Sequence, residues 1–140
     1  MNRTIIARDP TEMEEIGVEI ASDLSDGTLV SIVGPLGSGK TTLTKGIAKG
    51  LLVTDLVVSP SYLLAREYRG RIPLHHIDAY RTASLAELSE VGLDAYLPPE
   101  EGTTVVEWPE RIDGLVEASD ILVTIEFLDE GARRVNVSRP

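Results

Sequence analysis

The stretch SIVGPLGSGKTTLTKG, residues 31–46, joins an apolar run to a helical pattern through a segment rich in glycine. Its residues 34–41 read G-P-L-G-S-G-K-T and fit the pattern G-x-x-x-x-G-K-[ST]. Glycines allow successive backbone N–H groups to turn toward one point and form a concave anion site. A helix that begins there adds the partial positive charge of its N-terminus. The stretch therefore predicts a phosphate-binding P-loop between a strand and a helix.

Two side chains of the motif complete this prediction. Lys40 can reach the β- and γ-phosphates of a bound nucleotide, and the hydroxyl of Thr41 can bind Mg²⁺. The sequence has three lysines, and the other two, Lys45 and Lys49, lie within ten residues of Lys40. On helix patterning, these two are expected on a solvent-exposed helix face.

The elements around the P-loop follow from hydrophobic spacing. Apolar residues at helical intervals predict a helix with Thr11 as its cap and Gly27 as its stop. A β-branched run predicts a strand at residues 28–34, and a helix is expected over residues 39–52.

Further along the chain, Pro60 excludes a helix, and strands are expected on either side of Ser59-Pro60. Ser84 as cap, Glu87 at the third position and Gly92 as stop predict a short helix. The remaining strands are expected within residues 72–80, 103–108 and 120–138, the last being two strands joined by a turn at Glu130-Gly131.

This order of elements predicts the fold class. Strands alternate with helices at first and then end in a hairpin. We expect an α/β protein with the three-layer P-loop NTPase fold, a mostly parallel sheet and an antiparallel C-terminal hairpin. A length of 140 residues fits one domain, residues 1–140.

Composition excludes several classes of function. There is no cysteine, so disulfides, thiol catalysis and the usual zinc ligands are excluded. A net charge of −10 disfavours autonomous nucleic-acid binding. The N-terminal residues lack the apolar core of a signal peptide, and no run is long enough to span a membrane. These features predict a cytoplasmic protein.

Two acidic residues directly follow apolar strand patterns. Asp78 ends LHHID and Glu107 ends TVVE. In open α/β sheets such positions lie at the nucleotide, where carboxylates complete the Mg²⁺ shell or orient the attacking water. The alternative is a structural role, as strand-end caps or in ion pairs with Arg81 and Arg111.

The histidines and the single tryptophan are less informative. His75 and His76 are adjacent in a predicted strand, so they face opposite sides and cannot chelate one metal together. Composition alone favours a core position for Trp108.

Five segments of the sequence occur in the order GPLGSGKTTLTKGIAKGL, VVSPSYLL, PLHHIDAYR, ELSEVGLDAYL and VVEWPER. The P-loop alone fits many families, but its combination with the motifs S-P-[ST]-[FY], H-x-D-x-Y-R and E-W-P-E-R is specific. In these segments and their order, the sequence resembles the TsaE family, small bacterial P-loop ATPases of tRNA threonylcarbamoyladenosine synthesis.

The resemblance implies roles for particular residues. It implies ATP and Mg²⁺ as ligands, with catalytic roles for Lys40, Asp78 and Glu107, and with Thr41 and Glu107 as Mg²⁺ ligands. The implied nucleotide contacts are Leu36, Gly37, Ser38, Gly39, Lys40, Thr41, Thr42, Asp78 and Arg133.

Three further matches are less direct. The family's tryptophan next to the Glu of E-W-P matches Trp108, which gives this residue an implied functional role. The SPSY segment resembles a switch-like segment near the γ-phosphate, where Ser61 departs from the usual threonine but keeps the hydroxyl. The C-terminal GARRVNV resembles a segment with a nucleotide-contacting arginine, which we assign to Arg133 with Arg134 as the alternative.

The resemblance also implies partners and an activity. TsaE-like proteins bind TsaD and TsaB and hydrolyse ATP, weakly alone, while the partners hold the tRNA. No membrane association is expected.

Two other functions remain open. One is a small-molecule kinase, for which little chain is left after Trp108 to form a lid or an acceptor site. The other is a nucleotide sensor that does not hydrolyse ATP.

Overall fold

The computed structural model describes residues 2–60, 64–82 and 84–139 and has one seven-stranded sheet, in the order β1-β7-β6-β2-β5-β4-β3. Its four central strands are parallel. In sheet order they are β6 (Ile121–Phe127), β2 (Leu29–Val33), β5 (Thr103–Glu107) and β4 (Pro73–Asp78).

Antiparallel strands extend the sheet on both sides. On one side, β7 (Arg133–Ser138) pairs with β6 and β1 (Asn2–Ala7) pairs with β7. On the other side, β3 (Ala65–Arg69) pairs with β4. Only β7 and β3 run against the other strands, so the mostly parallel sheet and the C-terminal hairpin are confirmed.

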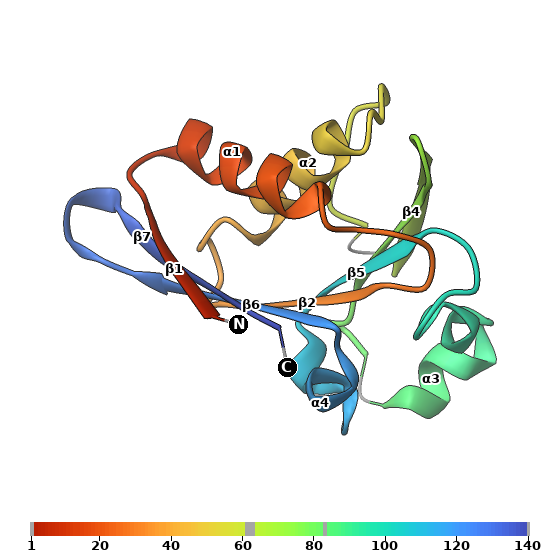
Figure 1. Ribbon diagram of the computed structural model, residues 1–140. Coiled ribbons are helices and arrows are strands. Elements are labelled where there is room, and N and C mark those ends of the chain that lie inside the picture. The colour runs from red at the N-terminus through yellow and green to blue at the C-terminus, as the bar shows by residue number, and fades with distance from the viewer. Residues whose placement is uncertain (1, 61–63, 83, 140) are drawn as a thin grey trace.

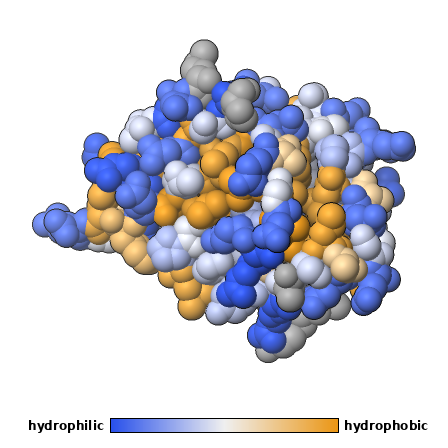
Figure 2. Space-filling view, turned by 90° about the horizontal axis from the view of Figure 1, so that it is seen from below, coloured by the Kyte–Doolittle hydropathy of each residue, from blue (hydrophilic) through white to orange (hydrophobic). Residues whose placement is uncertain are grey.

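Helices cover both faces of the sheet and produce the expected three layers (Figure 1). Two longer helices lie on one face, α1 (Pro10–Ala21) and α2 (Lys40–Gly50). The opposite layer is built of α3 (Leu85–Glu90), α4 (Leu115–Ala118) and the 3₁₀ turns η1 (Leu93–Tyr96) and η2 (Pro109–Arg111); a third turn, η3 (Asp129–Gly131), connects β6 and β7. Seen from below in Figure 2, this side shows hydrophobic patches between hydrophilic ones. Within the described ranges, none of the helices has the length and hydrophobicity of a membrane span.

The central strands bury side chains on both faces. In β2, Val30 and Ile32 belong to the core under α1 and α2, whereas Leu29 belongs to the core on the opposite face. In β5, Val105 and Val106 divide in the same way. Burial on both faces explains why these strands read as continuous apolar runs rather than as alternating ones.

Helices α1 and α2 approach each other backbone to backbone. A Cβ atom added at Gly46 would lie 2.0 Å from the carbonyl oxygen of Glu14, and one added at Gly17 would lie 2.3 Å from that of Leu43. Since no larger side chain fits at either position without displacement, the two glycines fix the spacing of the helices. This contact holds α2, the helix that follows the P-loop, against the rest of its layer.

Two sequence predictions about the N-terminal region are wrong, and one strand was missed. The cap of α1 is Asp9, not Thr11, and its side chain accepts the N–H of Glu12 at 2.8 Å. The chain favours Asp9 because Pro10 then occupies the first helical turn, where its missing N–H costs nothing. The helix ends at Ala21 rather than near Gly27. Strand β1 was not predicted, because its only neighbour, β7, lies at the other end of the sequence.

Of the two strands expected on either side of Ser59-Pro60, only the second is formed among the described residues. This second strand is β3, but residues 56–60, all described, form no strand. Instead, Val58 bonds the hydroxyl of Tyr68 through its N–H at 3.2 Å and its carbonyl at 3.4 Å. Ser61 and its neighbour Tyr62 lie outside the described residues. By contrast, α3 has the predicted cap, with Ser84 accepting the N–H of Glu87.

Candidate nucleotide-binding site

The P-loop, residues 34–41, connects β2 to α2 as its sequence predicts. Gly37 has φ of 77° and Gly39 has φ of 107°, in the left-handed region that glycine adopts without strain. Gly39 is the N-cap of α2, so the first turn of this helix begins within the loop. The first N–H groups of a helix have no intrahelical partners and bind anions readily.

A cavity of about 390 Å³ opens beside the loop. It brings together every nucleotide-contacting, catalytic or metal-binding residue expected from the sequence except Arg133. Its lining is Leu36, Gly37, Ser38, Gly39, Lys40, Thr41, Thr42, Ser59, Asp78, Tyr80, Arg81, Glu107 and Trp108. Sequence reasoning missed Tyr80 and Arg81 as wall residues, although both follow Asp78 directly in the H-x-D-x-Y-R motif.

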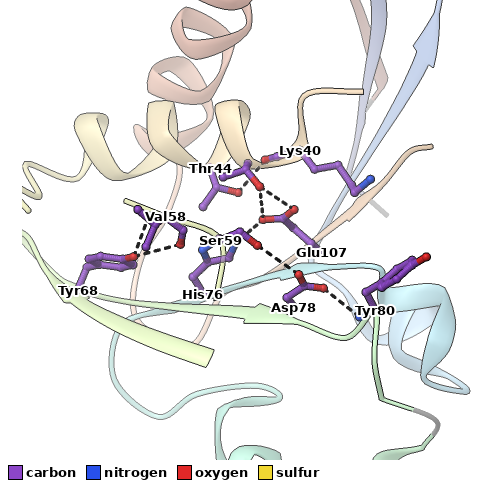
Figure 3. Close-up of polar contacts among 10 residues, drawn as sticks. Lys40, Thr44, Val58, Ser59, Tyr68, His76, Asp78, Tyr80 and Glu107 are labelled. Carbon is purple, nitrogen blue, oxygen red and sulfur yellow. Dashed lines mark hydrogen bonds and ion pairs between the residues drawn. The ribbon is translucent and has the colours of Figure 1, made fainter. Parts of the chain in front are cut away.

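Glu107 and Thr41 both line this cavity and contact each other, and Figure 3 shows the Glu107 carboxylate with polar side chains around it. The Thr41 hydroxyl donates to the Glu107 carboxylate, with Oγ1 lying 3.1 Å from Oε1 and 3.2 Å from Oε2. Glu107 is 3% exposed, and its Oε2 also contacts Nε2 of His76. The alternative considered from the sequence, an ion pair of Glu107 with Arg111, is not formed among the described residues, and the Arg111 guanidinium lies 4.9 Å from the centre of the Tyr80 ring.

Asp78 lies on the neighbouring strand, in register with Glu107. Its Oδ1 accepts the N–H of Tyr80 at 2.9 Å, and its Oδ2 accepts the hydroxyl of Ser59 at 3.4 Å. Asp78 therefore ties the end of β4 to the segment around Ser59, and it leaves the contact with Thr41 to Glu107.

Lys40 is buried and turned toward the loop itself. Its Nζ donates to the carbonyls of Gly34 at 2.7 Å and Pro35 at 3.0 Å, and lies 3.9 Å from the centre of the Trp108 ring. Burial lowers the pKa of Lys40 from its ordinary value, while the negative charges of Glu107, Glu110 and Asp78 act in the opposite direction. A cation in this position is already desolvated, which strengthens its interaction with an anion.

Trp108 forms one wall of the cavity, although composition alone favours the core. Its ring packs against the core on the α3 side and also contacts the Tyr80 ring, with 4.8 Å between centroids. The backbone of Trp108 has φ of 62°, which turns the chain sharply after β5. This turn places the side chains of Glu107 and Trp108 at the same cavity.

Arg133 lies on the other side of the P-loop. Its Nε donates to the carbonyl of Ser38 at 3.3 Å and its Nη2 to that of Gly37 at 3.5 Å. Arg134 instead lies 3.7 Å from Glu126 in an exposed ion pair. Arg133 is thus the one of the two arginines that reaches the loop.

A second cavity of about 140 Å³ lies next to Arg133. It shares Gly37, Ser38, Gly39 and Thr42 with the first cavity, so the P-loop separates the two. Its remaining lining is Ala7, Asp9, Pro10, Met13, Gly131 and Arg133. The hydroxyl of Ser38 is buried and has no hydrogen-bond partner among the described residues.

The oxygen atoms of Thr41 and Glu107 fit Mg²⁺. Among the described residues, no group of three or more His, Cys, Asp and Glu side chains is arranged to hold a metal ion alone. Mg²⁺ does not require such a group, because it keeps several waters and takes one or two protein ligands besides phosphate oxygens.

His75 and His76 face opposite sides of β4, as their adjacency predicts. His75 stacks on Tyr96, with 4.3 Å between ring centroids, whereas His76 contacts Glu107. The contact of His76 was not predicted, although alternation along the strand places it on the same face as Asp78.

Comparisons with known proteins identify the family of this chain. The family model described as "Threonylcarbamoyl adenosine biosynthesis protein TsaE" matches residues 7–135. A protein of Nostoc sp. is 36% identical over 138 residues, covering 96% of this chain and 84% of the relative. A protein of Treponema pallidum is 30% identical over 133 residues, covering 95% of this chain and 98% of the relative. Both are named tRNA threonylcarbamoyladenosine biosynthesis protein TsaE.

A solved structure is similar over almost the whole chain. The crystal structure of YdiB from Bacillus subtilis superposes with a TM-score of 0.80 and 28% sequence identity, covering 99% of this chain and 86% of that one.

Proposed function

The chain belongs to the TsaE family, and on that premise we propose that it binds ATP and Mg²⁺ at the P-loop and hydrolyses ATP as the partner of TsaB and TsaD in tRNA threonylcarbamoyladenosine biosynthesis. The names of its relatives support the pathway. The geometry of the two cavities supports the nucleotide.

The contact between Thr41 and Glu107 is the observation on which the ATPase proposal rests. A P-loop hydroxyl and a buried carboxylate from the next strand lie within hydrogen-bond distance. Burying a carboxylate is costly unless it is paired or meets a metal. In the proposal, these two oxygen ligands would hold Mg²⁺, whose positive charge would offset the charge that develops on the phosphate oxygens.

The other residues of the cavity act on the nucleotide directly. Lys40 exchanges the carbonyls of Gly34 and Pro35 for the β- and γ-phosphates, where a full positive charge forms stronger hydrogen bonds. Glu107 orients or activates the attacking water. Asp78 lies in register with Glu107 on the adjacent strand and assists Glu107 in this role. The amides of residues 36–42 hold the phosphates.

The second cavity is the proposed place of the adenosine end. Thr42 borders both cavities, so a nucleotide whose phosphates follow the P-loop continues past this residue. Arg133 contacts the nucleotide from the outer side of the loop.

The proposed partners complete a site that is open on one side. Leu36 is 76% exposed and Tyr80 is 42% exposed, and both line the mouth of the first cavity. A partner that covers this mouth would exclude water and bind more tightly when the γ-phosphate is present. The net charge of −10 agrees with a tRNA held by the partners rather than by this chain.

The test is an ATPase assay of the chain alone and with TsaB and TsaD. We expect slow turnover alone and a change when the partners are added, because groups supplied by a partner raise rates in switch NTPases by about 10³–10⁵. Pull-downs with ATP, ADP and no nucleotide measure how far partner binding depends on the bound nucleotide. Equal partner affinity in all three, with unchanged turnover, would refute the proposal and favour the small-molecule kinase, for which an acceptor screen is the next measurement.

A further inference from the structure

His76 is a fully buried polar side chain that touches the proposed catalytic carboxylate. It lies in the middle of β4 with 0% of its surface exposed. Its Nε2 contacts Oε2 of Glu107, whereas its Nδ1 has no hydrogen-bond partner among the described residues. Figure 3 shows the ring between β4 and the carboxylate. The ring therefore has one polar contact, and that contact is with the site.

The contact has a defined direction. An ionised carboxylate can only accept hydrogen bonds, so Nε2 is the donor and Glu107 the acceptor. The Glu107 carboxylate then has two donors, the Thr41 hydroxyl on one side and the His76 ring on the other. The two donors come from different elements, Thr41 from the first turn of α2 and His76 from β4, the strand next to β5.

In the proposed function, the two donors have different roles. Thr41 would turn its hydroxyl oxygen to Mg²⁺, and it would then no longer hold Glu107 as it does here. His76 is held in the sheet and keeps its contact. Outer partners of this kind orient metal-binding side chains, and their loss typically costs about 10–100-fold in metal affinity or activity.

We propose that His76 is a positioning residue, which holds the Glu107 carboxylate in the orientation that binds Mg²⁺. This inference rests on the function proposed above, because it needs Glu107 to meet Mg²⁺ together with Thr41. It assigns His76 no contact with nucleotide or metal, and its effect passes through Glu107 alone.

Two substitutions separate the hydrogen bond from the packing of the ring. The side-chain nitrogen of glutamine extends to about the position of Nε2, so His76→Gln can still donate to Glu107. The nitrogen of asparagine lies near Nδ1, which contacts no polar group here, so His76→Asn fills part of the space without that bond. Both variants bury an amide, which makes them a matched pair.

His75 offers a control on the same strand. It is 7% exposed and therefore buried almost as fully, but its ring stacks on Tyr96 and its Nε2 lies 3.1 Å from the carbonyl of Glu101. A His75→Gln variant reports the cost of replacing a buried histidine of β4 on the face away from the site.

The experiment is a calorimetric titration of each variant with ATP, with and without Mg²⁺, beside thermal unfolding of each. In the wild type, Mg²⁺ should increase ATP affinity. We expect His76→Asn to reduce this increase about 10–100-fold while metal-free affinity stays unchanged. His76→Gln and His75→Gln should keep most of the increase. A role in folding alone would lower the unfolding temperature without changing the ratio of the two affinities.

A second measurement tests that the effect passes through Glu107. When Glu107→Gln is already present, His76→Asn should reduce the Mg²⁺-dependent increase no further. The inference is overturned if His76→Asn keeps the full increase, if His76→Gln loses as much as His76→Asn, or if the double variant loses more than Glu107→Gln alone. If ATP binding by the wild type does not depend on Mg²⁺, the proposed function fails, and this inference fails with it.

Discussion

Acidic and basic groups meet in two regions of the molecule that differ in solvent exposure. One region is at the carboxyl ends of β4 and β5, and the other is at the edge of the sheet formed by β1. At the carboxyl ends, the Glu107 carboxylate is 3% exposed and meets Thr41 and His76. At the other edge, Arg3 and Glu19 form an ion pair of 2.9 Å between β1 and α1, and their side chains are 56% and 59% exposed.

The difference between these regions is one of desolvation. Water screens an exposed ion pair, and the entropy of fixing two long side chains offsets most of its gain. A buried carboxylate has no such screening, so the loss of a partner leaves an uncompensated charge. We therefore expect large effects from substitutions among the buried groups and small effects from the pairs at the exposed edge.

The largest effect is expected from Lys40→Ala. Lys40 is the P-loop side chain that brings a full positive charge to the first cavity, so its removal should abolish productive ATP binding. Titration calorimetry and phosphate release measure the two consequences. Lys45→Ala, an exposed lysine of the same helix, removes the same charge and should change neither. Wild-type behaviour of Lys40→Ala would show that the P-loop assignment is wrong.

Glu107→Gln should retain ATP binding and lose hydrolysis. The amide keeps the size of the side chain but not its charge or basicity, and removal of such a group typically costs about 10²–10⁴ in rate. Single-turnover assays with saturating Mg²⁺ and ATP measure it. Glu126→Gln, which removes the charge of an exposed carboxylate on β6, is the control. If Asp78→Asn gives the binding-competent, inactive enzyme and Glu107→Gln does not, the roles of the two carboxylates are exchanged.

Gly46→Ala tests the packing behind the site. The added methyl group would lie 2.0 Å from the carbonyl of Glu14, so α1 and α2 must move apart. Overpacking of this kind typically costs about 1–3 kcal/mol in the free energy of unfolding, which urea denaturation measures. Lys45→Ala serves again as the control. Unchanged stability would mean that the two helices adjust without strain, which would contradict the fixed spacing inferred from the glycines.

The smallest effect is expected from the pair of Arg3 and Glu19. A double-mutant cycle with Arg3→Ala and Glu19→Ala should give a coupling energy of about 0–1 kcal/mol, decreasing as salt is added. A coupling energy of several kcal/mol that does not decrease with added salt would contradict the proposed difference between exposed and buried charged groups.

The parts of the fold that depend on neighbouring residues were predictable from the sequence. The P-loop needs residues 34–41 and the elements that flank it, and the cap of α3 needs only Ser84 and Glu87. The glycine-rich loop between β2 and α2 and the Ser84 cap lie where the sequence predicts them. Each rests on chemistry within one or two turns of the chain, which a sequence shows directly.

The parts that depend on distant residues were not predictable. Strand β1 exists because β7 pairs with it, and the run of residues 2–7 shows no strong strand pattern without that partner. The meeting of His76 with Glu107 depends on the parallel register of β4 and β5. The cap of α1 is an intermediate case, since Asp9 and Thr11 both fit a cap and Pro10 decides between them.

The pairing of β1 with β7 has a consequence for how the protein is synthesised. Asn2 lies opposite Ser138 and Ala7 opposite Arg133, so the ribosome must make all other strands of the sheet between these two partners. The P-loop and its helix can therefore emerge long before β1 has a neighbour, and such long-range pairings slow folding. The same strand β7 brings Arg133 to the carbonyls of Gly37 and Ser38. A nascent chain without residues 133–138 would thus have its P-loop but not the arginine that donates hydrogen bonds to the carbonyls of this loop.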